Sequence, residues 1–272
     1  MIRSKLPYVI FLILGITVAA INVGGNYIIH FIDIYWPINE LSAINIVSSY
    51  FSAWSTESMG GYTAINIFNF PEYATIAFLY VIGLPTFLQE ILLIGLMEFL
   101  SMAFSFRILK EFILKSKNGD HTVISFFSAI ILTFNYSIIE IIWWDFIPNG
   151  FFLIGFGVAF LYYLLKFSRA YLTFGKFDSK SAILLFIFSA LSFSVNLEFN
   201  VNLIYLTLVF ILYSIISFKA PDIKLKKYMP YLIIIVAFIL LSNFWWIIPN
   251  IIFTITSSSI IPSSSYLGNI KT

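Results

Sequence analysis

Long apolar runs separated by short polar segments dominate this chain. A helix needs about 20 mostly apolar residues to cross a bilayer, and runs of that order recur as far as residue 248. The pattern predicts about seven spans, at residues 7–29, 86–106, 123–139, 150–166, 181–195, 201–218 and 231–248. The predicted fold class is an all-α integral membrane protein, a single transmembrane module over residues 1–272.

Composition supports this prediction and excludes several kinds of site. Hydrophobic residues make up 60% of the chain and charged residues 10%, whereas a soluble domain carries about 25% charged residues. The absence of cysteine excludes disulfides, thiolate metal sites and cysteine nucleophiles. Two histidines leave no room for a histidine-rich metal site. Nucleic acid is not an expected partner, because the net charge is only +2.

Basic residues set the expected orientation. Arg3 and Lys5 precede the first apolar run, which places the N-terminus in the cytoplasm. Alternating spans then put loops 107–121, 166–180 and 218–229 inside, so that 14 of the 15 basic residues are cytoplasmic. We therefore expect a multi-pass plasma-membrane protein whose Ser-rich tail, residues 256–272, lies outside.

The basic, apolar start of the chain fits two interpretations. It resembles a signal peptide with a processing site at residues 18–20. The helix can also continue beyond that site, and we prefer a retained first span.

The longest segment between predicted spans is an outer loop over residues 30–72, which contains no Lys or Arg. Apolar pieces at 44–54 and 74–85 are too short to cross, which predicts one or two short amphipathic helices on the membrane surface. Gly60 and Gly61 permit a tight turn or a close backbone approach. Trp36 and Trp54 fit either an aromatic belt at headgroup level or stacking on a sugar or lipid headgroup.

Carboxylates gather on the predicted outer side, at Asp33, Glu40, Glu57, Glu72, Glu140, Asp145 and Glu198. Carboxylate oxygens suit Mg²⁺ or Mn²⁺, and a carboxylate can act as general base on an acceptor hydroxyl. Alternatively, these loops are acidic only because basic residues are kept inside. Asp33 is the preferred catalytic candidate, because it directly follows the first span.

Glu198 and two further acids fall within or between predicted spans. The hairpin 181–218 has short arms, which places Glu198 at membrane depth or, if the arms are longer, in an ordinary outer loop. Glu90, near the outer end of its span, is expected to join a cavity. Glu98 is expected to be a paired or lumen-facing structural acid.

Short motifs give a family resemblance. The chain carries F-x-D-x-Y-x-P at Phe31–Pro37, W-x5-G-G at Trp54–Gly61 and N-x-W-W-x-x-P at Asn243–Pro249. With its span layout, it resembles the multi-spanning GT-C glycosyltransferases, in the branch of AftD-like arabinofuranosyltransferases and YfhO-like membrane proteins.

The resemblance implies a GT-C module that transfers a sugar from a polyprenyl-phosphate donor to an envelope glycan, lipid or protein acceptor. Asp33 would be the base or part of the acceptor site. Glu140 and Asp145 match metal-binding acids by position only, because no D-x-D is present. The remaining substrate-binding candidates are Trp36, Trp54, Gly60, Gly61 and Glu198.

Two other functions stay open. Such enzymes usually have further spans, so a chain of 272 residues is either an N-terminal module, a truncated copy or a non-catalytic membrane subunit. Acids at membrane depth, Glu98 and Glu198, favour a transporter or flippase of envelope lipids.

Overall fold

The computed structural model describes residues 2–23, 30–31, 34–35, 40–49, 70–114, 121–134, 153–193, 197–218 and 228–260. These residues are almost entirely helical, which confirms the all-α class. The α-helices are α1 (Ile2–Val23), α2 (Glu40–Ser49), α3 (Phe70–Val81), α4 (Thr86–Ile108), α5 (Thr122–Thr133), α8 (Val158–Phe174), α9 (Ser179–Ser192), α10 (Leu197–Ser217) and α11 (Tyr228–Ile260). The π-helical turns are η2 (Leu109–Ile113), which continues α4, and η3 (Leu153–Gly157), which leads into α8.

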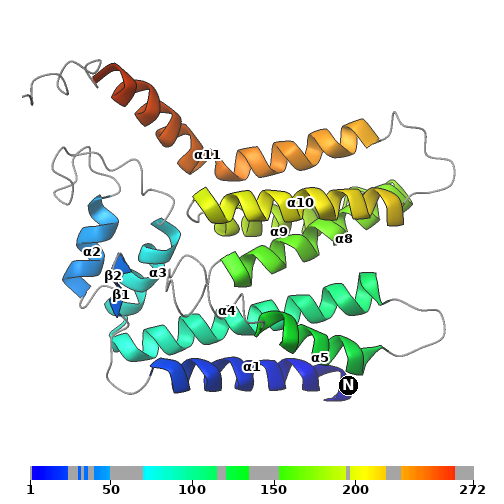
Figure 1. Cartoon of the computed structure of the whole chain (residues 1–272), viewed down its shortest axis with the longest axis horizontal. Coiled ribbons are helices and arrows are strands. Elements are labelled where there is room, and N and C mark those ends of the chain that lie inside the picture. The colour runs from blue at the N-terminus through cyan, green and yellow to red at the C-terminus, as the bar shows by residue number, and fades with distance from the viewer. Residues whose placement is uncertain are drawn as a thin grey trace, which may run out of the picture.

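A minimal β-pair is the exception to the helical fold. Strands β1 (His30–Phe31) and β2 (Ile34–Tyr35) pair antiparallel, with His30 opposite Tyr35 and Phe31 opposite Ile34. In Figure 1 this pair lies at the same end of the molecule as α2 and α3.

The long helices lie side by side along one axis and reverse direction from one to the next (Figure 1). Helix α4 is central, because it packs against α1, α5, η3 and α8. The largest core cluster surrounds α8, where Phe160, Tyr162 and Phe167 are fully buried against α9, α10 and α11. A smaller cluster joins α1, α4 and α5 around Phe11 and Met102.

Glycines allow the closest helix contacts. A Cβ atom built on Gly15 of α1 would lie 2.7 Å from the carbonyl oxygen of Gly95 in α4. A Cβ on Gly155 of η3 would lie 3.1 Å from the Cα of Met97. Small residues let helix backbones approach in this way, so α4 is held closely between α1 and η3.

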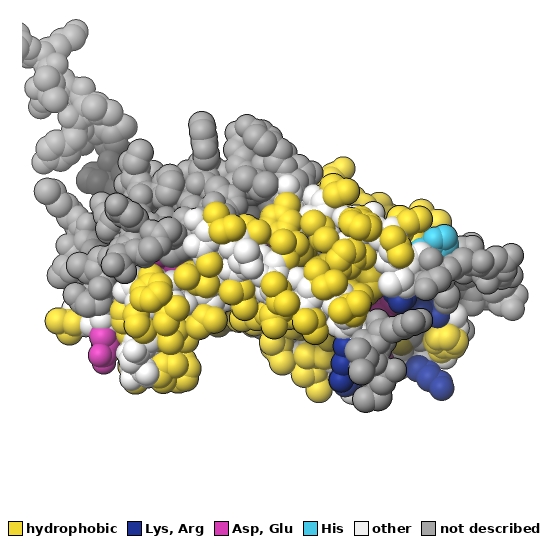
Figure 2. All heavy atoms as spheres, turned by 90° about the horizontal axis from the view of Figure 1, so that it is seen from below, with side chains coloured by type: hydrophobic (Ala, Val, Ile, Leu, Met, Phe, Trp, Pro, Cys, Tyr) yellow, Lys and Arg dark blue, Asp and Glu magenta, His cyan; other side chains and the backbone are white. Residues whose placement is uncertain are grey.

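Large apolar side chains remain exposed over much of the bundle. Figure 2 shows a broad hydrophobic face, and on α5 the side chains of Val123, Phe127 and Ile131 are each more than half exposed. Soluble monomers rarely expose contiguous apolar surface on this scale. The bundle therefore has the surface of a membrane-associated protein.

Helix length supports fewer spans than the sequence predicts. Within the described residues, only Thr86–Ile113 and Tyr228–Ile248 are long and apolar enough to cross a membrane. Shorter apolar helices occupy Lys5–Ile21, Thr122–Thr133, Ser179–Ser192 and Leu203–Ser217. Each predicted span does contain a helix, but seven crossings are not supported by these lengths.

Several predicted boundaries were wrong. The helix that begins at Thr86 continues through Ile113, and α8 continues to Phe174, so residues expected in cytoplasmic loops are helical. Helix α11 extends to Ile260, into the expected Ser-rich tail. It changes direction along its length (Figure 1). Pro249 lies within it, and proline removes a helical hydrogen bond and bends a helix without always ending it.

Candidate functional site

Most of the predicted site residues lie outside the described part of the chain. They are Asp33, Trp36, Trp54, Gly60, Gly61, Glu140 and Asp145. Glu198 lies in the first turn of α10, where the structure describes the backbone. The convergence of these residues on one outer cavity therefore stays a prediction.

Two short helices, α2 and α3, lie before and after residues 50–69 of the predicted outer loop, as expected from its apolar pieces. Ala43 of α2 and Tyr73, Ile76 and Ala77 of α3 form one buried cluster with Leu93 of α4. The two helices pack against each other and reach the N-terminal end of α4. The outer-loop segments are thus anchored to the central helix of the bundle.

Polar groups are buried at this same end of α4. Gln89 and Glu90 are both fully buried. The Gln89 Nε2 group donates to the carbonyl oxygen of Leu84 at 2.7 Å. The hydroxyls of Tyr80 and Thr86 are hydrogen-bonded at 2.8 Å. A carboxyl, an amide and a phenol therefore lie close to the point where α3 turns into α4.

The electrostatics of Tyr80 link it to Glu90. Burial raises the pKa of Tyr80 above its ordinary value, the hydrogen bond to Thr86 lowers it, and the Glu90 carboxylate raises it. Glu90 lies near the N-terminal end of α4, whereas its place at the outer side and in a cavity stays a prediction. Sequence reasoning missed Tyr80, because nothing in the spacing of the chain links it to Glu90.

Glu98 lies deeper in α4 and is 3% exposed. Its Cβ would be 3.5 Å from a Cβ on Gly15, so it lies beside the close contact of α1 with α4. Its Oε2 atom has no hydrogen-bond partner among the described residues. A buried polar atom left without a partner costs about 1–3 kcal/mol. The expected pairing is therefore absent at this oxygen.

No group of three or more His, Asp or Glu side chains suited to a metal ion occurs within the described residues. The proposed metal pair, Glu140 and Asp145, lies outside them. A Mg²⁺ or Mn²⁺ site consequently stays a prediction.

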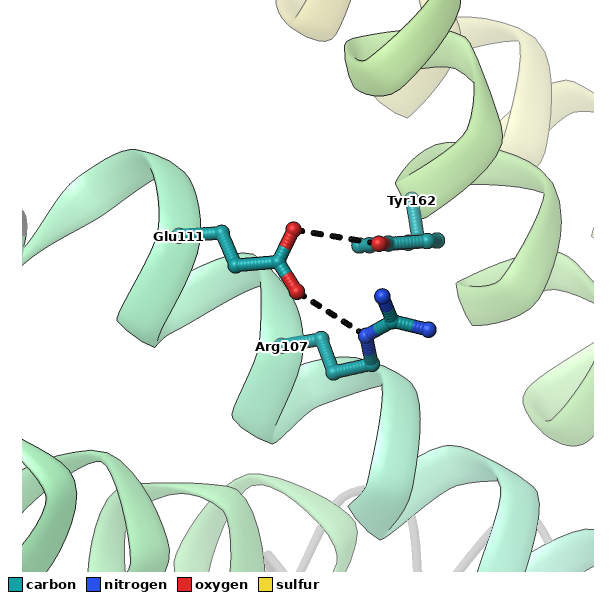
Figure 3. Close-up of polar contacts among 3 residues, drawn as sticks. All are labelled: Arg107, Glu111 and Tyr162. Atoms are coloured by element: carbon teal, nitrogen blue, oxygen red, sulfur yellow. Dashed lines mark hydrogen bonds and ion pairs between the residues drawn. The ribbon is translucent and has the colours of Figure 1, made fainter. Parts of the chain in front are cut away.

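A second polar cluster lies at the opposite end of α4 (Figure 3). The Arg107 Nε group donates to Glu111 Oε1 at 3.0 Å, and the Tyr162 hydroxyl donates to Glu111 Oε2 at 3.1 Å. Sequence reasoning placed Arg107 in a loop and did not consider Glu111. Their four-residue spacing was the available signal, whereas the contact with Tyr162 joins positions 51 residues apart.

A third cluster involves the N-x-W-W-x-x-P motif in α11. The Asn243 Nδ2 group donates to Ser189 Oγ of α9 at 3.2 Å, and Trp246 Nε1 donates to Asn243 Oδ1 at 2.8 Å. Ser242 Oγ also donates to Ser189 Oγ at 2.8 Å. Within the described residues, this part of the motif ties α11 to α9.

Comparison of the chain with protein-family models, with curated proteins and with solved structures finds no match.

Proposed function

We propose that this chain is a multi-pass membrane glycosyltransferase of the GT-C type. It takes a sugar from a polyprenyl-phosphate donor and passes it to a glycan, lipid or protein acceptor on the outer face of the plasma membrane. The observation that carries the proposal is the packing of α2 and α3 on Leu93 of α4, close in sequence to the buried Gln89 and Glu90. This packing anchors the two ends of an outer loop bearing acids and tryptophans near a polar part of the bundle.

We propose seven spans with a cytoplasmic N-terminus. The charge distribution supports this orientation. Lys and Arg side chains gather at one end of the molecule in Figure 2. The N-terminus lies at one end in Figure 1, whereas α2 and α3 lie toward the other. The basic end would face the cytoplasm and the α2–α3 end the outside, with the C-terminal tail also outside. The twelve-residue α5 would span only about 18 Å, so its crossing requires residues beyond Phe134.

In the proposed reaction, Asp33 takes the proton from an acceptor hydroxyl, whose oxygen attacks the anomeric carbon of the donor sugar. The bond from that carbon to the phosphate oxygen breaks, and polyprenyl phosphate leaves. Trp36 and Trp54 stack on the sugar, Gly60 and Gly61 admit the backbone close to it, and Glu198 lines the cavity. Carboxylates are suitable ligands for Mg²⁺ or Mn²⁺, and such an ion held by Glu140 and Asp145 would neutralise charge on the leaving phosphate.

The test is sugar transfer by the purified protein in nanodiscs, with labelled polyprenyl-phosphate sugars as donors. Asp33→Asn should abolish transfer, and a chelator should reduce it in the wild type. Asp178→Asn is the matched control, because Asp178 caps α9 on the loop between α8 and α9, and it should retain activity. Transfer by Asp33→Asn at the wild-type rate would remove this residue from the mechanism.

A second candidate is a transporter or flippase of envelope lipids, favoured by the buried Glu98. Glu98→Leu removes the unsatisfied carboxyl while keeping similar volume, so folding should be preserved. Loss of labelled polyprenyl-lipid flux in proteoliposomes, with no transfer by the wild type, would favour this function. Absence of both activities would leave a non-catalytic membrane subunit.

A further inference from the structure

Three cations near one end of the bundle lie over aromatic rings. The Arg107 guanidinium carbon is 4.3 Å from the ring centroid of Tyr162. The Lys110 and Lys166 ammonium nitrogens are 5.5 Å and 5.9 Å from the rings of Phe106 and Tyr163, respectively. We call Arg107, Lys110 and Lys166 the ring-seated cations. They come from α4, η2 and α8, and the two α8 rings are themselves in contact, with centroids 5.0 Å apart.

Arg107 is held in a way that leaves its outer edge available. Glu111 engages only its Nε group, and Glu111 is itself fixed by the Tyr162 hydroxyl (Figure 3). The terminal nitrogens of Arg107 have no hydrogen-bond partner among the described residues, and its side chain is 33% exposed. A guanidinium held through Nε, whose terminal nitrogens have no partner in the described part of the chain, matches the paired oxygens of a phosphate.

Two phenols complete the surroundings of Arg107. Tyr8 of α1 packs edge-on against Phe106 at 5.9 Å and interacts electrostatically with Arg107. Tyr163 of α8 also interacts with Arg107. Both tyrosines are half-buried, and a tyrosine hydroxyl is a hydrogen-bond donor suited to an anion. The three ring-seated cations outnumber the two nearby carboxylates, Glu111 beside Arg107 and Asp178 near Lys166, which leaves the site positively charged.

The position of this site indicates the source of the anion. The ring-seated cations come from the C-terminal end of α4, from η2 and from α8. Figure 2 shows Lys and Arg side chains gathered at one end of the molecule, next to exposed apolar surface. Long basic side chains at such a boundary extend toward lipid headgroups while their stems cover apolar surface. Basic sites between helices at the cytoplasmic side bind anionic headgroups.

We propose that the ring-seated cations, with Tyr8 and Tyr163, bind the phosphate headgroup of an anionic phospholipid. The inference rests on the membrane placement proposed above and is independent of glycosyl transfer. Phosphate recognition comes from Arg107, and Lys110 and Lys166 add positive charge. The three rings beneath them hold the cations in place.

The experiment is native mass spectrometry of the full chain in detergent, supplied with phosphatidylglycerol or with phosphatidylcholine of the same acyl chains. The wild type should retain phosphatidylglycerol preferentially. The triple variant Arg107→Gln/Lys110→Gln/Lys166→Gln should lower retention by at least about fivefold. The control is Arg169→Gln/Lys176→Gln/Lys180→Gln, which removes equal charge near the same end from side chains without ring contacts in the described structure. It should change retention less than about twofold.

A second variant controls for the case in which the triple variant misfolds. Lys110→Gln/Lys166→Gln keeps the hydrogen bonds of Arg107, Glu111 and Tyr162 intact, and should show an intermediate loss. Equal losses in the control and test triples would overturn the proposal, as would absence of a preference in the wild type. Displacement of the lipid by millimolar inorganic phosphate would assign the site to free phosphate and also overturn it. Because Asp33→Asn should retain the lipid normally, failure here is distinguishable from failure of the proposed reaction.

Discussion

At the scale of single residues, Asp178 shows how one side chain fixes a helix start. It is the N-cap of α9, and its Oδ1 and Oδ2 atoms accept hydrogen bonds from the backbone N–H and hydroxyl of Ser181 at 3.3 Å and 2.5 Å. The Ser181 hydroxyl is the largest influence lowering the pKa of Asp178 below its ordinary value, and the nearby Lys166 charge acts in the same direction.

Asp178→Ala should therefore lower the free energy of unfolding by about 0.5–1 kcal/mol at neutral pH, because an N-cap acceptor is lost. A lowered folded-state pKa stabilises above the unfolded value of about 3.9 and loses that effect as pH falls through the folded value. The difference from wild type should thus shrink in acid. Denaturant unfolding in detergent at pH 7 and below pH 4 measures it. A difference that grows in acid would contradict the assigned cap.

At the scale of elements, the contact of α1 with α4 depends on glycine rather than on side-chain interlocking. Alanine normally favours a helix over glycine by about 1 kcal/mol. A Cβ at position 15, however, would lie 2.7 Å from the Gly95 carbonyl oxygen, which is backbone and cannot rotate away.

Gly15→Ala should accordingly destabilise the protein by about 1–3 kcal/mol, as overpacking does in other tightly packed interiors. The direction of the change in stability distinguishes the two effects, because helix propensity alone predicts that Gly15→Ala stabilises the protein. Thermal unfolding in detergent gives the answer. A rise in melting temperature would show that α1 and α4 are farther apart than described here.

The elements also show what sequence could and could not predict. Long apolar runs were sufficient to locate a helix in each predicted span, and the short apolar pieces at 44–54 and 74–85 predicted α2 and α3. Boundaries were less predictable. The charges at Arg107 and Lys166 indicated loops, but Glu111 and the aromatic rings accommodate them on helices that continue further.

Side-chain partnerships between distant elements gave no sequence signal. Tyr162 and Glu111 meet because α8 packs along α4, and Asn243 reaches Ser189 because α11 packs on α9. Gln89 and Glu90 are likewise fully buried. Such burial follows from tertiary packing, which residue spacing within one helix does not determine.

At the scale of the whole molecule, two ends with different chemistry define the protein. Lys and Arg side chains gather toward one end (Figure 2), and α2 and α3 lie toward the other (Figure 1). Between them lies a bundle with large exposed apolar side chains. If this bundle crosses a bilayer, its apolar surface contacts the lipid tails and its two polar ends lie at opposite membrane surfaces.

The most direct test labels each end separately in intact cells. The chain has no cysteine, so Asn45→Cys on α2 and Lys176→Cys beyond α8 each introduce a single thiol at an exposed position. A membrane-impermeant maleimide should label Asn45→Cys in intact cells and Lys176→Cys only after permeabilisation. Labelling of both from outside, or the reverse pattern, would contradict the proposed orientation.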